Sequence, residues 1–345
     1  MKHRTLKPIC SLMSTILLLS CVLGSLAGCG TTLKDPVSVT GYKLNTYVTI
    51  KAYTTGGHST QELDTILTDA LALCDYYELM FSRTNSDSTL YKVNNNEITT
   101  VPAELGELIT AGLHYAELSN GAFDITVGSV SSLWDFTASN PSVPDETSLN
   151  TALESVDYTK VSVTPNSDGS YTVSKPKGTI IDLGAVAKGY IADKLKTFLL
   201  EKGIDHAIID LGGNILCVGG KTQSSNFLVG IKKPFSSDNT PLVTLSLNDV
   251  SAVSSGNYER YFRQNDKLYH HILNPKTGYP YENNLFGVTI ISKNSLTGDC
   301  LSTTCFALGL DDGLKLINET HGVEAMFVTS DGTIHYSDGF SPYVK

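Results

Sequence analysis

Hydrophobic and polar residues alternate along the chain with two periods, and each period predicts one kind of element. A Ser-x-x-Glu capping box at residues 59–62 precedes apolar residues spaced three and four apart up to Cys74, which predicts a helix. Strict alternation over residues 47–53 predicts a strand. Further helices are predicted from helical spacing between start and stop signals: Pro102 to Asn120, Leu183 to Gly203, Ser295 to Gly309 and Asp311 to Thr320. Ser295 is expected to cap the helix that it begins.

Short strands separated by turn residues make up much of the second half of the chain. The turn sequences at 212–214, 264–266 and 330–332 each lie between two short apolar runs and predict hairpins. Other strands are predicted at 179–182, 227–231, 242–247 and 288–292. Because hairpins outnumber strand–helix–strand units, the pattern favours an α+β fold with mixed, largely antiparallel sheets and packed helices.

The N-terminal segment has the features of a lipoprotein signal peptide. Three basic residues within the first seven precede an apolar run that ends in Leu-Ala-Gly-Cys at residues 26–29. We expect residues 1–28 to be removed, Cys29 to be lipidated, residues 29–40 to form a tether and residues 41–345 to form the folded domain. An uncleaved membrane anchor is the alternative, and either arrangement predicts an extracytoplasmic protein attached to the cell membrane.

The charge of the chain bears on its partners. The full sequence of 345 residues has a net charge of −10, and loss of the three basic residues in the signal segment makes the mature chain about −13. An acidic chain without a basic stripe is a poor ligand for nucleic acid, so we expect no nucleic-acid partner. An anionic ligand would instead be held locally by backbone amides, one or two cations or a metal ion.

The remaining cysteines predict neither a disulfide framework nor a zinc site. Each lies in an apolar or helical context, and none forms a close Cys-x-x-Cys pair. Apart from the lipidated Cys29, we expect buried free thiols at Cys74, Cys217, Cys300 and Cys305.

Asp299 and Thr303 are the strongest candidates for a metal site. They stand four residues apart at the start of a predicted helix, so their oxygen atoms share one face. A carboxylate and a hydroxyl in this arrangement suit a hard cation such as Mg²⁺.

His271 is the candidate general base. It precedes the turn-forming sequence of residues 274–278, and adjacent residues of a strand point to opposite faces, so only one of His270 and His271 faces the site. A purely structural histidine is the alternative.

Two glycine-containing segments are candidate ligand contacts. The small residues of 121–128 let a ligand approach the backbone, and Phe123 there could cover an aromatic ring, although a simple turn explains the glycines equally well. Residues 182–189 join a predicted strand to a helix, where backbone amides and Lys188 suit a phosphate. Their spacing matches neither a P-loop nor a dinucleotide-binding Gly-x-Gly-x-x-Gly motif.

Six motifs occur in an order that resembles the FAD:protein FMN transferases, the ApbE-like flavin transferases, from about Tyr42 to the C-terminus. They are Phe81-Ser82 with Ser88 and Asn94, residues 121–124 followed by 133–136, residues 181–184 with 187–189, residues 254–258, residues 271–278 and residues 299–303. The departures are Leu44-Asn45-Thr46 for the usual Met-Gly-Thr, Asn274 for a common Asp and Cys300 for a usual Ala.

The resemblance implies a T-fold-like architecture, a reaction and a set of site residues. The reaction is transfer of FMN from FAD to a Thr or Ser hydroxyl of an extracytoplasmic or membrane-bound acceptor flavoprotein, with release of AMP. Mg²⁺ would be held by Asp299, Thr303 and the backbone carbonyl of Ala185, and His271 would be the base. The implied FAD-lining residues are Leu44, Ala122, Phe123, Asp124, Asp182, Lys188 and Leu273.

Two other functions stay open at the level of sequence. A pyrophosphatase would use water in place of the acceptor hydroxyl and cut FAD to FMN and AMP. A non-catalytic lipoprotein would bind a flavin or another solute, but it would not need the Asp299–Thr303 pair beside a base.

Overall fold

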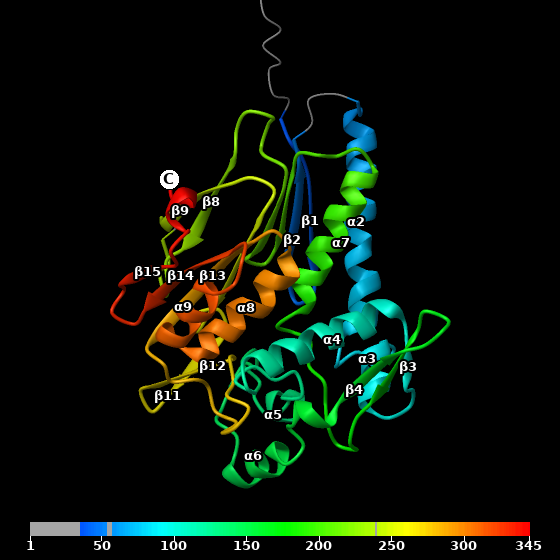
Figure 1. Cartoon of the computed structure of the whole chain (residues 1–345), viewed down its shortest axis with the longest axis vertical. Helices are drawn as coiled ribbons and strands as arrows, with labels where there is room; N and C mark the ends of the chain where they lie inside the picture. The colour runs from blue at the N-terminus through cyan, green and yellow to red at the C-terminus, as the bar shows by residue number, and fades with distance from the viewer. Residues whose placement is uncertain (1–34, 54–56, 239) are drawn as a thin grey trace, which may run out of the picture. The chain divides into compact units, whose positions relative to one another are not determined.

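An antiparallel sheet of eight strands forms the centre of the fold (Figure 1). The computed structural model describes residues 35–53, 57–238 and 240–345, and residues 36–345 form one compact unit. In spatial order the strands are β1 (Val37–Lys43), β2 (Thr46–Ala52), β6 (Ala207–Leu211), β7 (Asn214–Val218), β10 (Ser251–Gly256), β13 (Leu285–Ser292), β14 (Val323–Thr329) and β15 (Ile334–Tyr336).

Three smaller antiparallel sheets surround this centre. Their strands are β3 (Thr100–Val101), β5 (Tyr171–Ser174) and β4 (Ser162–Pro165) in the first, β8 (Phe227–Lys232) and β9 (Pro241–Leu247) in the second, and β11 (Tyr261–Gln264) and β12 (Lys267–His270) in the third. The largely antiparallel α+β fold predicted from the hairpins is thereby confirmed.

Helices cover one face of the eight-stranded sheet. The helices α2, α7 and α8 lie next to one another on this face, and α9 packs against α8 and β14 (Figure 1). The helices are α2 (Thr60–Phe81), α3 (Thr89–Asn94), α4 (Ala103–Leu118), α5 (Gly128–Ser131), α6 (Glu146–Leu153), α7 (Ala187–Glu201), α8 (Ser295–Leu308) and α9 (Leu310–Asn318), with short 3₁₀ helices at Tyr158–Lys160 and Ser341–Tyr343. Among the described residues, no helix is long and apolar enough to cross a membrane.

The sheet is buried on both sides, which explains its apolar sequence. In β7, Leu216 joins the core beneath α2 and α7, whereas the adjacent Cys217 joins a second core beneath β8 and β9. The four predicted thiols are buried and free, and burial raises the pKa of Cys74, Cys217 and Cys305 to about 12.

Most predicted elements are confirmed within a few residues, and one strand prediction is wrong. Residues 179–182 form only an isolated bridge between Val127 and Ile180. The reason is a side chain: Asn94 Nδ2 donates to the Ile181 carbonyl and Asn94 Oδ1 accepts from the Ile181 N–H, both at 2.9 Å. These groups are therefore not free to pair with a neighbouring strand.

Two boundaries also differ from the predictions. The helix expected from Leu183 begins at Ala187, after a turn. Ser295 does not cap α8 with its side chain; the Asp193 carboxylate of α7 instead accepts the N–H groups of Ser295 and Leu296 at 2.8 and 2.9 Å. The signal segment and Cys29 lie outside the described residues, and β1 begins at Val37, inside the range assigned to the tether.

Gly189 allows α7 and α8 to approach closely. A Cβ atom at this position would lie 2.7 Å from Leu296 Cα and 2.8 Å from Asp299 Cβ, and it would also meet the Ser295 carbonyl. A side chain of any size would force the two helices apart.

We therefore expect Gly189→Ala to lower the free energy of unfolding by about 1–3 kcal/mol, as overpacking of a close contact does. Urea unfolding followed by circular dichroism measures the change. Thr197→Ala, an exposed substitution on the same helix, is the control and should stay within about 0.5 kcal/mol. Equal stability of the Gly189 and Thr197 variants would show that the helices separate without cost.

Candidate functional site

Asp299 lies one turn into α8, at its contact with α7. Only 3% of the residue is exposed. Its Oδ2 atom accepts the backbone N–H of Gly189 at 2.8 Å, and its Oδ1 atom lies 3.7 Å from the Lys188 ammonium nitrogen. The first turn of α7 thus brings a backbone donor and a cation to a buried carboxylate.

Burial raises the pKa of the Asp299 carboxyl group, although Lys188 and the Gly189 N–H oppose the shift. The Asn214 amide beside it also lowers the pKa, yet Asn214 Nδ2 is buried and has no hydrogen-bond partner of standard geometry among the described residues. This carboxylate is therefore buried with its negative charge incompletely compensated.

Hydroxyl groups surround the other predicted metal ligand. Thr303 Oγ1 lies 3.0 Å from Ser255 Oγ of β10, which in turn lies 2.8 Å from Ser302 Oγ. Among the described residues there is no cluster of three or more His, Cys, Asp or Glu side chains. A carboxylate, hydroxyls and backbone carbonyls are donors for a hard cation, so the residues fit Mg²⁺ better than a soft metal.

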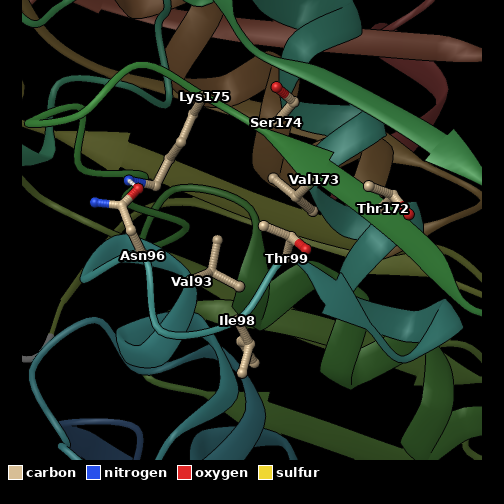
Figure 2. A pocket seen from close by; sticks show the side chains of 8 residues that line it. All are labelled: Val93, Asn96, Ile98, Thr99, Thr172, Val173, Ser174 and Lys175. Atoms are coloured by element: carbon tan, nitrogen blue, oxygen red, sulfur yellow. Dashed lines mark hydrogen bonds between the residues drawn. The ribbon is translucent and has the colours of Figure 1, made fainter.

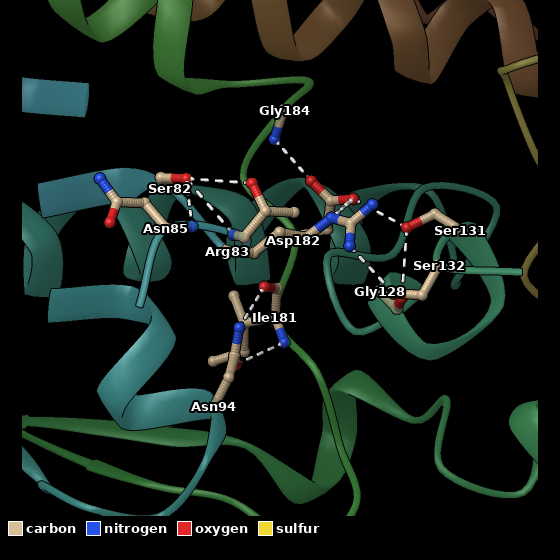
Figure 3. A network of polar contacts seen from close by, with 11 residues as sticks. Ser82, Arg83, Asn85, Asn94, Gly128, Ser131, Ser132, Ile181, Asp182 and Gly184 are labelled. Atoms are coloured by element: carbon tan, nitrogen blue, oxygen red, sulfur yellow. Dashed lines mark hydrogen bonds and ion pairs between the residues drawn. The ribbon is translucent and has the colours of Figure 1, made fainter. Parts of the chain in front are cut away.

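A polar network joins Asp182 to two distant segments (Figure 3). Arg83 Nε and Ser131 Oγ both donate to Asp182 Oδ2 at 2.8 Å, and the Gly184 N–H donates to Oδ1 at 2.9 Å. Arg83 also donates from Nη1 to Ser132 Oγ at 2.9 Å. The end of α2, the end of α5 and the turn before α7, which contains Ala185, therefore meet at this carboxylate.

A separate pocket of about 240 Å³ contains none of the predicted site residues (Figure 2). Lys175 at its edge donates to the carbonyls of Asn94 and Thr179 at 3.0 and 2.9 Å. Burial lowers the pKa of Lys175. Together with Asn94, this lysine supports the segment that leads to Asp182, so we assign it a structural role.

Two of the predicted FAD contacts at residues 121–124 are used internally. The Phe123 ring is 5% exposed and packs in the hydrophobic core. The Asp124 carboxylate accepts the N–H and hydroxyl of Thr126 at 2.7 Å and the Tyr158 N–H at 3.1 Å. Ala122 is partly exposed, and its carbonyl accepts the Tyr281 hydroxyl at 2.7 Å.

The two adjacent histidines have different surroundings. His270 ends β12 and is buried: its Nε2 donates to the Tyr281 carbonyl at 3.0 Å, and its ring packs edge-on against Phe306. His271 is partly exposed, but its Nδ1 atom is buried and has no partner among the described residues. Burial, then the nearby Arg260, His270 and Lys188, lower the pKa of His271 to about 3.

Lys188 therefore lies near both Asp299 and His271, the predicted metal ligand and the predicted base.

Leu273 is only 8% exposed and packs with Trp134 and its neighbours. Leu44 stands in the turn between β1 and β2 with a left-handed φ of 54°, and its N–H donates to Glu78 Oε2 at 3.2 Å.

Residue patterns alone did not identify Arg83, Ser131, Asn214 or Ser255 as members of these networks. Arg83 directly follows Ser82 of the first motif, and Ser255 lies within the motif of residues 254–258, so proximity to a motif was the available signal. Asn214 was assigned to the hairpin turn of residues 212–214, whereas it begins β7 and lies beside Asp299.

Comparison with known proteins gives a consistent result. Residues 44–327 match the ApbE family. The chain is 34% identical over 298 residues to the FAD:protein FMN transferase of Treponema pallidum, with 82% of each chain covered. It is also 34% identical over 261 residues to the FAD:protein FMN transferase of Klebsiella pneumoniae, with 75% of this chain and 80% of the relative covered.

Solved structures agree with this result. The ApbE protein of Thermotoga maritima matches with a TM-score of 0.80 and 30% identity, covering 90% of this chain and 100% of that chain. The flavin transferase ApbE from Vibrio cholerae matches with a TM-score of 0.78 and 25% identity, covering 90% and 99%.

In chelator-treated protein, we expect Asp299→Asn to raise the unfolding temperature at neutral pH. Because its pKa is raised, the folded chain binds this proton more tightly than the unfolded chain does, so ionisation of Asp299 lowers stability above the folded-state pKa. The gain should shrink as the pH falls toward 3.8, the ordinary value, below which both states are protonated. Calorimetry across this range measures it, and a lower unfolding temperature at neutral pH would contradict the expectation.

Proposed function

The chain belongs to the ApbE family and is a flavin transferase, and from this premise we propose that it moves FMN from FAD to a Thr or Ser hydroxyl of an extracytoplasmic acceptor protein with the help of Mg²⁺. The observation that carries the proposal is the pairing of a buried, incompletely compensated carboxylate with a hydroxyl one helical turn later, at Asp299 and Thr303.

The reaction is a phosphoryl transfer. The acceptor hydroxyl oxygen forms a bond to the phosphorus of the FMN half, and the bond from this phosphorus to the bridging oxygen breaks. AMP leaves with that oxygen, and the hydroxyl proton is released. Positioning and neutralisation of charge provide most of the catalysis in such reactions.

Asp299 and Thr303 would hold Mg²⁺ together with the backbone carbonyl of Ala185. When bound, the ion would neutralise charge on the two phosphates of FAD. The site offers a carboxylate, hydroxyls and carbonyls without a histidine or cysteine cluster in the described part of the chain, and that donor set supports the choice of ion.

The segment of residues 182–189 would hold the phosphate end of FAD. Its backbone amides lie in the turn before α7 and at the start of that helix, and Lys188 adds a positive charge that is only partly neutralised by Asp299 at 3.7 Å. Asp182 would line the same site in a fixed orientation, since Arg83, Ser131 and the Gly184 N–H already hold its carboxylate. Leu44, Ala122 and Leu273 would supply backbone and apolar contacts.

His271 would accept the proton of the acceptor hydroxyl. With its pKa lowered to about 3, the imidazole is neutral at physiological pH and has a free lone pair. Arg260 and Lys188 contribute to this low pKa, so neutralisation of these cations by the phosphates of FAD would raise it toward the range of an effective base.

Mass spectrometry of an acceptor protein incubated with FAD, Mg²⁺ and the mature chain tests the proposal directly. A mass increase equal to covalently attached FMN, accompanied by AMP, supports transfer. Formation of free FMN and AMP at the same rate with and without acceptor would instead identify a pyrophosphatase.

We expect Asp299→Ala to abolish FMN transfer while leaving the fold intact, because the carboxylate is the only charged group among the proposed metal ligands. Circular dichroism checks the fold, and the acceptor mass checks transfer. If Asp299 only interacted with the helix dipole, it would contribute less than about 1 kcal/mol to the stability of the fold, and transfer would persist in the variant. Persistent transfer at saturating Mg²⁺ would therefore show that Asp299 does not bind the metal ion.

We expect His271→Ala to slow transfer by about 10²–10⁴-fold, the usual range for loss of general acid–base catalysis, with little change in FAD affinity. Single-turnover kinetics and flavin fluorescence separate the two effects. His270→Ala is the comparison, and because His270 bonds to the Tyr281 carbonyl and packs on Phe306, it should act through stability. Weaker FAD binding with an unchanged rate at saturation would make His271 a ligand contact instead.

The N-terminal pattern supports a second proposal, that the protein is anchored to the outer side of the cell membrane by a lipid on Cys29. We expect Cys29→Ser to move the protein from the membrane fraction to the soluble fraction, as measured by fractionation and immunoblotting. If membrane association persists, the apolar segment is an uncleaved anchor.

A further inference from the structure

An exposed patch of aromatic and basic residues lies where the β8–β9 loop meets β11. Phe235 and Tyr261 are 38% and 40% exposed, and their ring centroids are 5.2 Å apart. Lys233 precedes Phe235 in the loop, and Arg263 lies on the same side of β11 as Tyr261. We call these four residues, with Arg260, the basic aromatic patch.

Phe235 keeps its exposed position despite an unfavourable backbone conformation. Its φ of 55° lies in the left-handed region, which bulky side chains rarely adopt. Edge-on contacts with Tyr258 at 6.0 Å, Tyr261 at 5.2 Å and Phe286 at 5.2 Å hold the ring in place. Neighbouring aromatics thus fix a partly exposed ring at the surface.

The patch borders the proposed reaction centre. Tyr258, which supports Phe235, packs over Gly256, and the preceding residue, Ser255, contacts Thr303 at 3.0 Å. On the other side, the Arg260 carbonyl accepts the His271 N–H at 3.2 Å. The patch is therefore joined to the proposed site through Ser255, which contacts Thr303, and through the Arg260–His271 hydrogen bond.

The charge of the patch is opposite to that of the protein as a whole. Lys233, Arg260 and Arg263 are exposed, and none forms an ion pair within residues 35–53, 57–238 and 240–345. Lys232 already pairs with Glu259 at 3.8 Å, and Asp238 lies near Lys233 without forming an ion pair. The full chain has a net charge of −10, so these free cations form a local exception.

We propose that the basic aromatic patch binds the acceptor protein through an acidic segment with apolar side chains next to the modified hydroxyl. This inference rests on the proposed function, because only a transferase needs to dock a protein chain beside its metal site. An anionic lipid surface would also be attracted to cations and aromatics, but the position beside His271 and Thr303 favours the protein substrate.

Binding of two short fluorescein-labelled peptides tests the proposal. Both peptides contain one Thr and the same leucines. In the acidic peptide the Thr is flanked by aspartates and glutamates, and in the basic peptide it is flanked by lysines. Fluorescence anisotropy with the mature chain should show binding of the acidic peptide about tenfold tighter than that of the basic peptide, and salt should weaken it.

Two patch variants and a matched control complete the experiment. The double substitution Lys233→Glu with Arg263→Glu, and Phe235→Asn, in which Asn tolerates the left-handed backbone, should each weaken acidic-peptide binding about tenfold. Lys177→Glu with Lys315→Glu makes the same charge change at exposed sites outside the patch and should leave binding unchanged. FAD affinity, measured by flavin fluorescence, should be equal in all variants.

Equal affinity of the chain for both peptides would overturn the proposal, and so would equal losses of acidic-peptide binding in the patch and control double variants. Binding of the chain to phosphatidylglycerol vesicles is measured in parallel. Patch variants that lose vesicle binding but keep acidic-peptide binding would also overturn it. The last outcome would identify a membrane contact. Failure of the proposed function is separate, because it appears as absent FAD binding or absent FMN transfer in the unchanged chain, whatever the peptides do.

Discussion

The close approach of α7 and α8 at Gly189 is the constraint on which the site depends. Without a side chain at this position, the Gly189 N–H reaches the buried Asp299 carboxylate at 2.8 Å. One turn later on α7, Asp193 accepts the first N–H groups of α8, which fixes the start of that helix. Lys188, next to Gly189, then lies 3.7 Å from Asp299 and contributes to the lowered pKa of His271. Backbone proximity thus sets the position of Asp299 against the start of α7.

Side-chain hydrogen bonds, not strand pairing, hold the segment that precedes α7. The segment before α7 has almost no strand partners, and Asn94, Lys175 and Arg83 hold it instead. The Arg83 and Asn94 contacts join parts of the chain that are 99 and 87 residues apart in sequence. An irregular segment held in this way keeps its backbone amides available, which a strand in a ladder would not do.

Local patterns predicted most of the fold, since helical spacing and hairpin turns depend on neighbouring residues. The pairing of Asp299 with Thr303 was predictable for the same reason, because helix geometry fixes positions four apart. The wrong strand at residues 179–182 and the incorrectly assigned cap of α8 have one cause: distant side chains, Asn94 and Asp193, compete for backbone groups. The internal use of Asp124 by Thr126 and Tyr158 likewise depends on tertiary contacts that a motif does not reveal.

The buried thiols have a practical consequence for studying this chain. Cys74, Cys217, Cys300 and Cys305 are all fully buried, and burial suppresses formation of the reactive thiolate. A thiol reagent therefore reaches them only when the surrounding structure opens. Since Cys217 lies beneath β8 and β9 while Cys300 and Cys305 lie within α8, their separate labelling rates report how readily each layer of the molecule opens in solution.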